Sequence, residues 1–79
     1  MYEPEFSQVR LRSGKAYQFR YVNHRGEDEI RDAVVDHFLF GNFAYYPEPQ
    51  WFVHTFDTIK KAPRTFALKD MSEIKEHVG

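Results

Sequence analysis

Residues 45–71 constrain the fold more than any other part of the chain. They hold an alternating aromatic segment, 51–57, then a short polar connection, and then a second alternating segment that begins at Arg64. Aromatic and β-branched residues favour strands, and a short polar connection between two such segments indicates a hairpin. The sequence therefore predicts an antiparallel pair of strands that presents aromatic faces and a fixed cation. This pattern is typical of a binding surface and not of a catalytic centre.

The length and composition of the chain set the size of its core. Its 79 residues allow one domain, 1–79, and the absence of cysteine excludes disulfides and cysteine-based zinc sites. Eight Phe, five Tyr and one Trp supply the apolar area that so small a domain needs. No apolar run is long enough for a bilayer and no signal-peptide pattern is present, so we expect a cytoplasmic protein without a membrane partner.

The first half of the chain shows the two-residue period of strands. Tyr17, Phe19 and Tyr21 alternate with polar residues, and turn signals at 13–15 and 23–26 flank this segment. Residues 27–40 are ambiguous, because the second half is β-branched and aromatic whereas apolar residues also recur at helical spacing. We predict a long strand there, with a helix over 27–37 as the alternative.

Residues 41–49 contain glycine and proline residues that indicate where strands begin or end. Gly41 and Asn42 are expected to turn the chain into the next strand. Pro47 and Pro49 cannot donate to a sheet ladder, so we expect them at a strand entrance or a sheet edge.

The C-terminal residues have the pattern of a short helix. Asp70 followed by Glu73 resembles a capping box, and Met71, Ile74 and Val78 have helical spacing. Five or six short strands with tight turns precede this segment. A small antiparallel sheet of this kind avoids exposed edges by curling. The prediction is a mainly β fold, a small, partly open SH3-like (Sm-like) antiparallel β-barrel with a short C-terminal helix.

Four short motifs are shared with one known family. They are Trp51-Phe52-Val53, Arg64-Thr65-Phe66-Ala67-Leu68, the pair Tyr45-Tyr46, and the turn at 21–27 with Arg31. Together, over about residues 17–74, they resemble the WYL domain family, small SH3-like barrels of bacterial regulators and phage genomes. Two features depart from that family: no proline closely follows Arg31, and no helix-turn-helix segment is present.

The resemblance implies a ligand-sensing or nucleic-acid-contacting barrel detached from its usual effector domains. The chain is also similar to short stand-alone proteins of bacteria and phages. It would then act in the cytoplasm of a bacterium or of an infected bacterial host.

Aromatic and basic residues form the candidate ligand site. Tyr45, Tyr46 and Trp51 have the faces needed to stack a nucleobase, although Trp51 also suits the core of a small barrel. Arginine binds phosphate through two parallel hydrogen bonds, and the candidates for this role are Arg20, Arg31 and Arg64. The alternatives for these arginines are a solvated face or ion pairs with Glu29, Asp32 or Asp57.

Catalytic and metal-binding patterns are missing from the sequence. No histidine has a metal-ligand spacing, and we expect structural roles for His37 and His54 even if they meet across strands. No serine is paired with an oriented base and no glycine-rich phosphate loop occurs. We therefore expect a protein that is not an enzyme and needs no cofactor.

Three hypotheses for function follow. The first is a regulatory module that binds a nucleotide second messenger or a short single-stranded nucleic acid, and that in a phage modulates host defence or regulation. The second is a protein–protein module that uses the aromatic stretch 38–56 to bind a second copy or a host protein. The third is a DNA-binding regulator with basic segments at 7–26 and 60–69, although the net charge of −1 disfavours it.

Overall fold

The computed structural model describes residues 2–6, 9–43 and 45–77, and strands dominate them. The strands are β1 (Glu5–Phe6), β2 (Val9–Arg10), β3 (Ala16–Val22), β4 (Asp28–Phe43), β5 (Tyr46–Asp57), β6 (Ala62–Ala67) and β7 (Met71–Glu76). One short 3-10 helix, η1 (Leu68–Asp70), joins β6 to β7, and the described residues form no α-helix. The prediction of a mainly β fold is confirmed. No helix in these ranges is long and apolar enough to cross a membrane.

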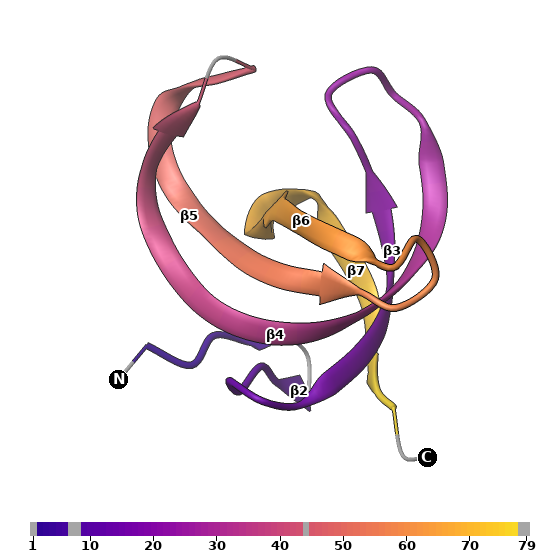
Figure 1. The fold of residues 1–79 in the computed structure, drawn as a ribbon. Coiled ribbons are helices and arrows are strands. Elements are labelled where there is room, and N and C mark those ends of the chain that lie inside the picture. Colours follow the sequence, from indigo (N-terminus) through magenta and orange to yellow (C-terminus); the bar gives the residue numbers. More distant parts are fainter. Residues whose placement is uncertain (1, 7–8, 44, 78–79) are drawn as a thin grey trace.

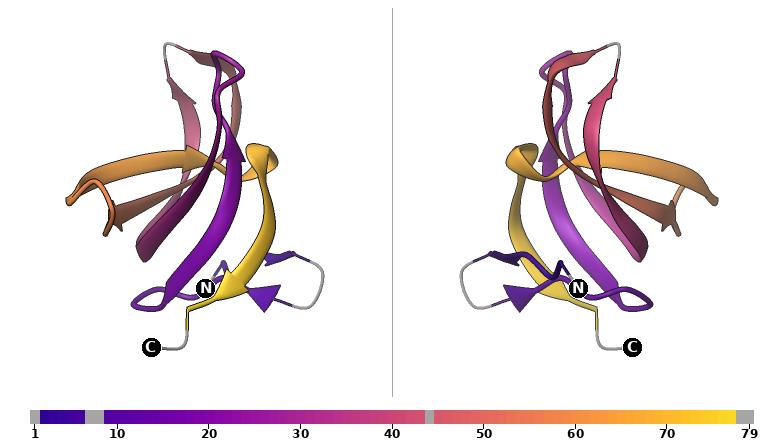
Figure 2. Two further views of the ribbon diagram at one scale, coloured as in Figure 1. Left: turned by 90° about the vertical axis from the view of Figure 1, so that its right-hand side faces the viewer. Right: turned by 90° about the vertical axis from the view of Figure 1, so that its left-hand side faces the viewer.

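Five of the strands form one curved antiparallel sheet (Figure 1). Their order is β6-β5-β4-β3-β7, and β1 and β2 pair separately as a small ribbon. The long strands β4 and β5 are strongly bent, which is visible in all three views (Figures 1 and 2). Among the described residues β6 and β7 are not hydrogen-bonded to each other, so the sheet does not form a closed barrel. The 3-10 helix η1 connects these two edge strands.

The segment predicted as a long strand is confirmed as β4, and the helical alternative is wrong. A β-bulge between Val35 and His37 interrupts its pairing with β5. Val35 is buried, and Phe38, three residues on, packs against the same core. The bulge therefore lets two residues three positions apart share one face of the sheet, a spacing that is also found in helices. The predicted turn at Gly41–Asn42 is wrong, because β4 continues to Phe43, and Ala44 lies outside the described residues.

The predicted C-terminal helix is also wrong, because the segment forms β7 against the free side of β3. Gln18 pairs with Lys75 and Arg20 with Ser72, so β7 carries one more residue than β3 between these pairs. Glu73 lies in this bulge with φ of 50°. The extra residue places Met71 and Ile74, 6% and 9% exposed, on the same core face. Val78 lies outside the described residues.

The core is one cluster of buried side chains to which all five strands of the sheet contribute. Tyr17, Phe19 and Tyr21 are all buried, as the alternation of β3 predicts. The Phe66 ring packs edge-on against Phe19 and Tyr21, with centroids 5.1 and 4.7 Å apart. Such aromatic packing suits a small core without disulfides.

Two hairpin tips lie at the same end of the molecule, opposite the end where β2 lies (Figures 1 and 2). The β3–β4 turn is fixed by Asn23, whose Oδ1 accepts the backbone N–H groups of Arg25 and Glu27 at 2.9 Å each. Gly26 adopts φ of 80°, which a side chain would disfavour. The other tip lies between β4 and β5. The candidate site lies between these two tips.

Candidate functional site

A hollow of about 270 Å³ brings together four of the six side chains predicted for the ligand site. It lies between the β3–β4 hairpin, the start of β5, and β6. The four predicted residues in its wall are Arg31, Tyr45, Tyr46 and Arg64. The wall also includes Phe52, Phe66 and His24. The combination of flat aromatic faces and guanidinium groups suits a ligand that has both a ring and an anionic group.

The aromatic rim of the hollow is a stack of Tyr45 on His24. The two ring centroids lie 4.0 Å apart and the planes differ by 10°. Tyr45 is 68% exposed, so this ring contributes little to the core. His24 was not predicted for the site from the sequence, because only the relative position of two separate hairpin tips brings it there. The one sequence feature that points to His24 is its position in a turn rich in polar residues.

Tyr46 is held by an internal hydrogen-bond network. Its hydroxyl donates to Asp70 Oδ2 at 3.1 Å and lies 3.1 Å from the hydroxyl of Tyr21. The Tyr21 hydroxyl also accepts the backbone N–H of Ala67 at 2.9 Å. Burial and the contact between the two hydroxyls raise the pKa of Tyr46, and burial raises that of Tyr21. The polar end of Tyr46 is thus committed to the fold, and its ring remains in the wall.

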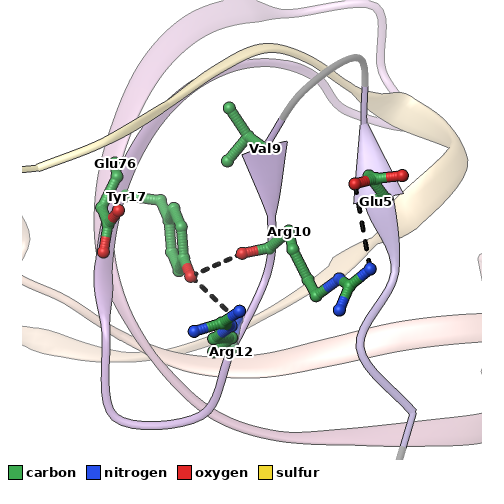
Figure 3. Close-up of a pocket in the computed structure, with 6 residues that line it drawn as sticks. All are labelled: Glu5, Val9, Arg10, Arg12, Tyr17 and Glu76. Carbon is green, nitrogen blue, oxygen red and sulfur yellow. Dashed lines mark hydrogen bonds and ion pairs between the residues drawn. The ribbon is translucent and has the colours of Figure 1, made fainter.

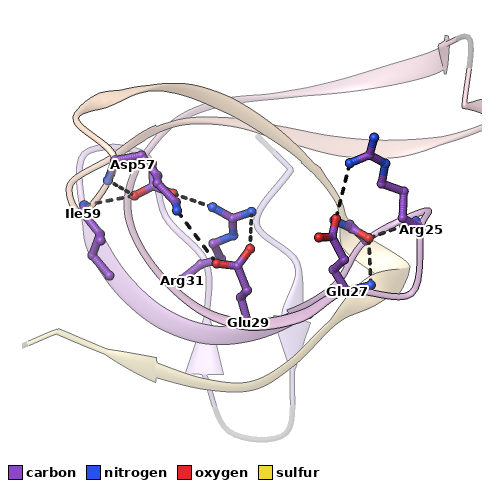
Figure 4. A network of polar contacts seen from close by, with 8 residues as sticks. Arg25, Glu27, Glu29, Arg31, Asp57 and Ile59 are labelled. Atoms are coloured by element: carbon purple, nitrogen blue, oxygen red, sulfur yellow. Dashed lines mark hydrogen bonds and ion pairs between the residues drawn. The ribbon is translucent and has the colours of Figure 1, made fainter.

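Arg31 forms the ion pairs that the sequence left open as an alternative (Figure 4). Its Nη1 donates to Asp57 Oδ2 at 3.2 Å and its Nη2 to Glu29 Oε1 at 3.3 Å. The guanidinium also lies 5.5 Å from the Phe66 ring centroid. With two carboxylates beside it, Arg31 brings no excess positive charge to the hollow.

Arg64 supplies the positive charge that remains available. It lies on the outer strand β6, where it is exposed and opposite Thr55. Its Nη1 donates to the carbonyl of Pro63 at 2.8 Å, and within residues 2–6, 9–43 and 45–77 it forms no ion pair. A guanidinium at the rim with free donors suits the capture of a phosphate.

The structure separates the other two predicted residues from this hollow. Trp51 stacks on Tyr2 with centroids 3.9 Å apart and meets Phe40 edge-on at 5.3 Å. Arg20 bonds Asp28 and Glu73 through its guanidinium, and all three side chains are largely exposed. The bond from Arg20 lowers the pKa of Asp28. Neither Trp51 nor Arg20 lines the hollow.

A second hollow of about 390 Å³ lies on the other side of the aromatic rim. It shares Asn23, His24, Tyr45 and Tyr46 with the first hollow. Lys69 also lines it, with its ammonium 5.6 Å from the Tyr46 ring centroid. The stacked rings therefore stand between two neighbouring hollows, each with a cation.

A larger hollow of about 480 Å³ lies beside β2 (Figure 3). Its wall carries charges of both signs, with Arg10 and Glu5 3.9 Å apart. The Tyr17 hydroxyl accepts the backbone N–H of Arg12 at 2.8 Å and donates to the carbonyl of Arg10 at 2.9 Å. These bonds attach β2 to β3, so we interpret this region as structural.

The fold and the site define a small antiparallel β-sheet protein with an aromatic hollow that has an arginine at its rim. In comparisons with protein-family models, curated proteins and solved structures, no significant match to this chain was found. The likeness to WYL domains therefore rests on the short motifs of the sequence and stays a prediction.

Proposed function

We propose that this chain is a non-enzymatic binding module for a nucleotide-containing ligand, either a nucleotide second messenger or a short single-stranded nucleic acid. One observation carries the proposal. Residues that the sequence suggested separately, two for stacking and two for phosphate, line a single hollow. Ring stacking and phosphate binding are the two contacts by which proteins hold nucleotides without reading their sequence.

The residues of the hollow take different roles in this proposal. Tyr45, with His24, stacks the base, and Arg64 binds the phosphate. Arg31 acts as a positioning residue through Asp57, whose Oδ1 accepts the backbone N–H groups of Ile59 and Lys60 at 2.9 Å each. These bonds fix the β5–β6 turn and thereby the start of the strand that carries Arg64.

The size of the two hollows indicates the kind of ligand. Ligand pockets commonly measure about 300–1,000 Å³. The first hollow, at about 270 Å³, lies just below this range and would take a single nucleotide unit, and the second, at about 390 Å³, offers room for a further unit. A ligand with two or more nucleotide units would cross the rim formed by His24 and Tyr45.

The strand order supports an SH3-like fold for this module. After a four-strand meander, the chain passes through η1 and returns as β7 to pair beside β3, the first strand of the meander. We propose on this basis, and on the sequence motifs, a stand-alone WYL-like domain. In the cytoplasm of an infected bacterium such a domain would sequester a signalling nucleotide or modulate a host regulator.

Thermal melting against a panel of ligands tests the proposal. The panel contains mononucleotides, cyclic oligonucleotides, and short single-stranded DNA and RNA. A ligand at about 100 times its dissociation constant adds about 2.7 kcal/mol, which shifts the melting temperature by more than about 5 °C in a small domain. We expect one class to give this shift with the wild type and not with Tyr45→Ala. No shift with any class would overturn the proposal.

A second candidate function is binding of a second copy of this chain through an outer aromatic strip. The strip consists of Tyr2, Phe40 and Trp51, of which Phe40 is 59% exposed and lies opposite Trp51 in the sheet. Exposed aromatic clusters are unusual in monomers. Light scattering after size exclusion would show a dimer that Phe40→Ser converts to a monomer, whereas a monomeric wild type would contradict it.

The charge distribution gives the DNA-binding alternative little support. Four side chains of the two basic segments lie beside carboxylates, and they are Arg10, Arg20, Arg25 and Lys60. Pairing of this kind reduces the number of cations free to contact phosphates. DNA binding would require a steep loss of affinity with salt, and a flat salt profile excludes it.

A further inference from the structure

Two histidines face each other across the sheet, outside the proposed nucleotide site. His37 of β4 is paired directly with His54 of β5, and their ring centroids lie 5.2 Å apart with planes 40° from each other. The bulge after Val35 creates this pair. Val35 lies opposite Thr55, so a regular ladder would place Asp36 opposite His54, and the extra residue puts His37 there instead.

Each ring has an oxygen atom next to its Nδ1. His54 Nδ1 lies 2.9 Å from Thr65 Oγ1, and His37 Nδ1 lies 3.2 Å from Asp36 Oδ2. Among the described residues no hydrogen bond engages the Nε2 atom of either ring. In the tautomer that donates Nδ1–H to this oxygen, the lone pair is on Nε2, which is the arrangement of most metal-binding histidines.

The spacing of the rings also fits a shared metal ion. Two imidazoles that bind one tetrahedral ion, each with a metal–nitrogen distance of about 2.0–2.1 Å, have ring centroids about 5 Å apart. The His37–His54 separation is 5.2 Å. His54 and Asp36 also line a hollow of about 340 Å³, so this side of the histidine pair is open to solvent.

We propose that His37 and His54 bind one late first-row divalent cation, Zn²⁺ or Cu²⁺, through their Nε2 atoms. Imidazole nitrogen favours these ions over Mg²⁺ and Ca²⁺, which take oxygen ligands, and Cu²⁺ binds tighter than Zn²⁺. Within the described residues no three His, Cys, Asp or Glu side chains are grouped to hold a metal. Water therefore completes the coordination, and the Asp36 carboxylate offsets part of the charge of the ion from beside His37.

Titration calorimetry with CuCl₂ and ZnCl₂ on protein free of any histidine tag tests this site. We expect one ion per chain, with Cu²⁺ binding tighter than Zn²⁺ and no heat from MgCl₂. His37→Gln and His54→Gln should each weaken Cu²⁺ binding by about tenfold or more, because each removes one of two protein ligands. His77→Gln, a matched change at an exposed histidine paired with Asp32, should leave the affinity unchanged.

A measurement on the unaltered protein keeps the test independent of how the variants fold. Substoichiometric Cu²⁺ should broaden the NMR signals of the His37 and His54 rings before those of His24 and His77. The proposal is overturned if the wild type binds neither ion, if binding survives both substitutions, or if His77→Gln removes it.

Discussion

Arg31 donates a hydrogen bond to Asp57 across the β4–β5 interface, and the Asp57 side chain is fully buried. A buried carboxylate is stable only when paired and hydrogen-bonded, and Asp57 meets this condition through Arg31 and two backbone N–H groups of the next turn. One contact thus joins the middle of the sheet to the hairpin that leads to Arg64. The same contact neutralises Arg31 and leaves Arg64 as the cation available at the hollow.

Loss of this carboxylate should destabilise the fold strongly. Asp57→Ala leaves the largely buried Arg31 guanidinium with Glu29 as its one remaining carboxylate partner among the described residues, and the expected loss in the free energy of unfolding is about 3–5 kcal/mol. Asp36→Ala, at an exposed position of β4, should cost no more than about 0.5 kcal/mol. Urea denaturation measures both. Equal effects of the two substitutions would show that the Arg31–Asp57 pair does not stabilise the fold.

Two tyrosines, the buried Tyr21 and the partly buried Tyr46, predict a loss of stability at high pH. The pKa values of Tyr21 and Tyr46 are raised above their ordinary value of 10.0, mainly because burial disfavours the phenolate. As the pH rises, the unfolded chain therefore loses these protons at a lower pH than the folded chain does. Their contribution to stability is complete below about pH 10 and is lost as the pH rises further. Thermal melting between pH 8 and 12 should show a falling melting temperature above about pH 10.

Tyr46→Phe provides the control for this pH effect, because it removes one partly buried ionisable hydroxyl and keeps the ring. The alkaline decline should be shallower in Tyr46→Phe than in the wild type. Tyr45→Phe, at an exposed ring, should keep the wild-type slope. If the melting temperature fell equally steeply with pH in all three proteins, the raised pKa of Tyr46 would not be the cause of the alkaline decline.

The β5–β6 turn offers a stabilising substitution. Lys61 adopts φ of 56°, in the left-handed region, where a side chain is strained by about 1–2 kcal/mol. Lys61→Gly should raise the free energy of unfolding by about 1 kcal/mol, because relief of strain exceeds the added chain entropy. Lys60→Gly, one residue earlier and without positive φ, should lower it. Denaturation curves in which Lys61→Gly is the less stable variant would contradict this geometry.

The stack of His24 on Tyr45 predicts a specific loss of ligand binding. Either His24→Ala or Tyr45→Ala should reduce the affinity for the nucleotide ligand by about 1–3 kcal/mol, the usual effect of removing one stacking ring. Phe56→Ala, at an aromatic side chain 47% exposed on a different surface, should leave the affinity unchanged. Fluorescence titration with the ligand that gives the largest melting shift measures these differences. A loss that is equal in all three variants would contradict a role for the stack.

The strands with regular alternation could be predicted from the sequence, but the bulged ones could not. Tyr17, Phe19 and Tyr21 alternate without interruption, and their burial follows directly. In β7 the bulge at Glu73 converts the strand period into a spacing of three between Met71 and Ile74, which a sequence pattern cannot distinguish from a helix turn. β7 pairs with β3, which lies about 50 residues earlier in the chain. Local sequence propensities cannot predict a pairing between such distant segments.

The candidate site could be predicted in its chemistry and only partly in its geometry. Residue type and sequence position indicate Tyr45 and Tyr46, which lie beside a proline-containing segment, and Arg64, which begins a predicted strand. The sequence could not show that Trp51 lies with Tyr2 away from the hollow, because that depends on the register of β5. The charge state of Arg31 also stayed open, since its partner Asp57 is 26 residues away in sequence.

The affinity of Arg64→Ala for the best ligand of the panel tests the central claim most directly. Calorimetric titration of that ligand into the wild type, Arg64→Ala and Arg12→Ala compares the cation at the hollow with an exposed arginine at the other end of the molecule. Loss of a charge-assisted phosphate contact should weaken binding by more than about tenfold in Arg64→Ala. Arg12→Ala should bind like the wild type. An Arg64→Ala protein that folds and binds with unchanged affinity would contradict a nucleotide site in this hollow.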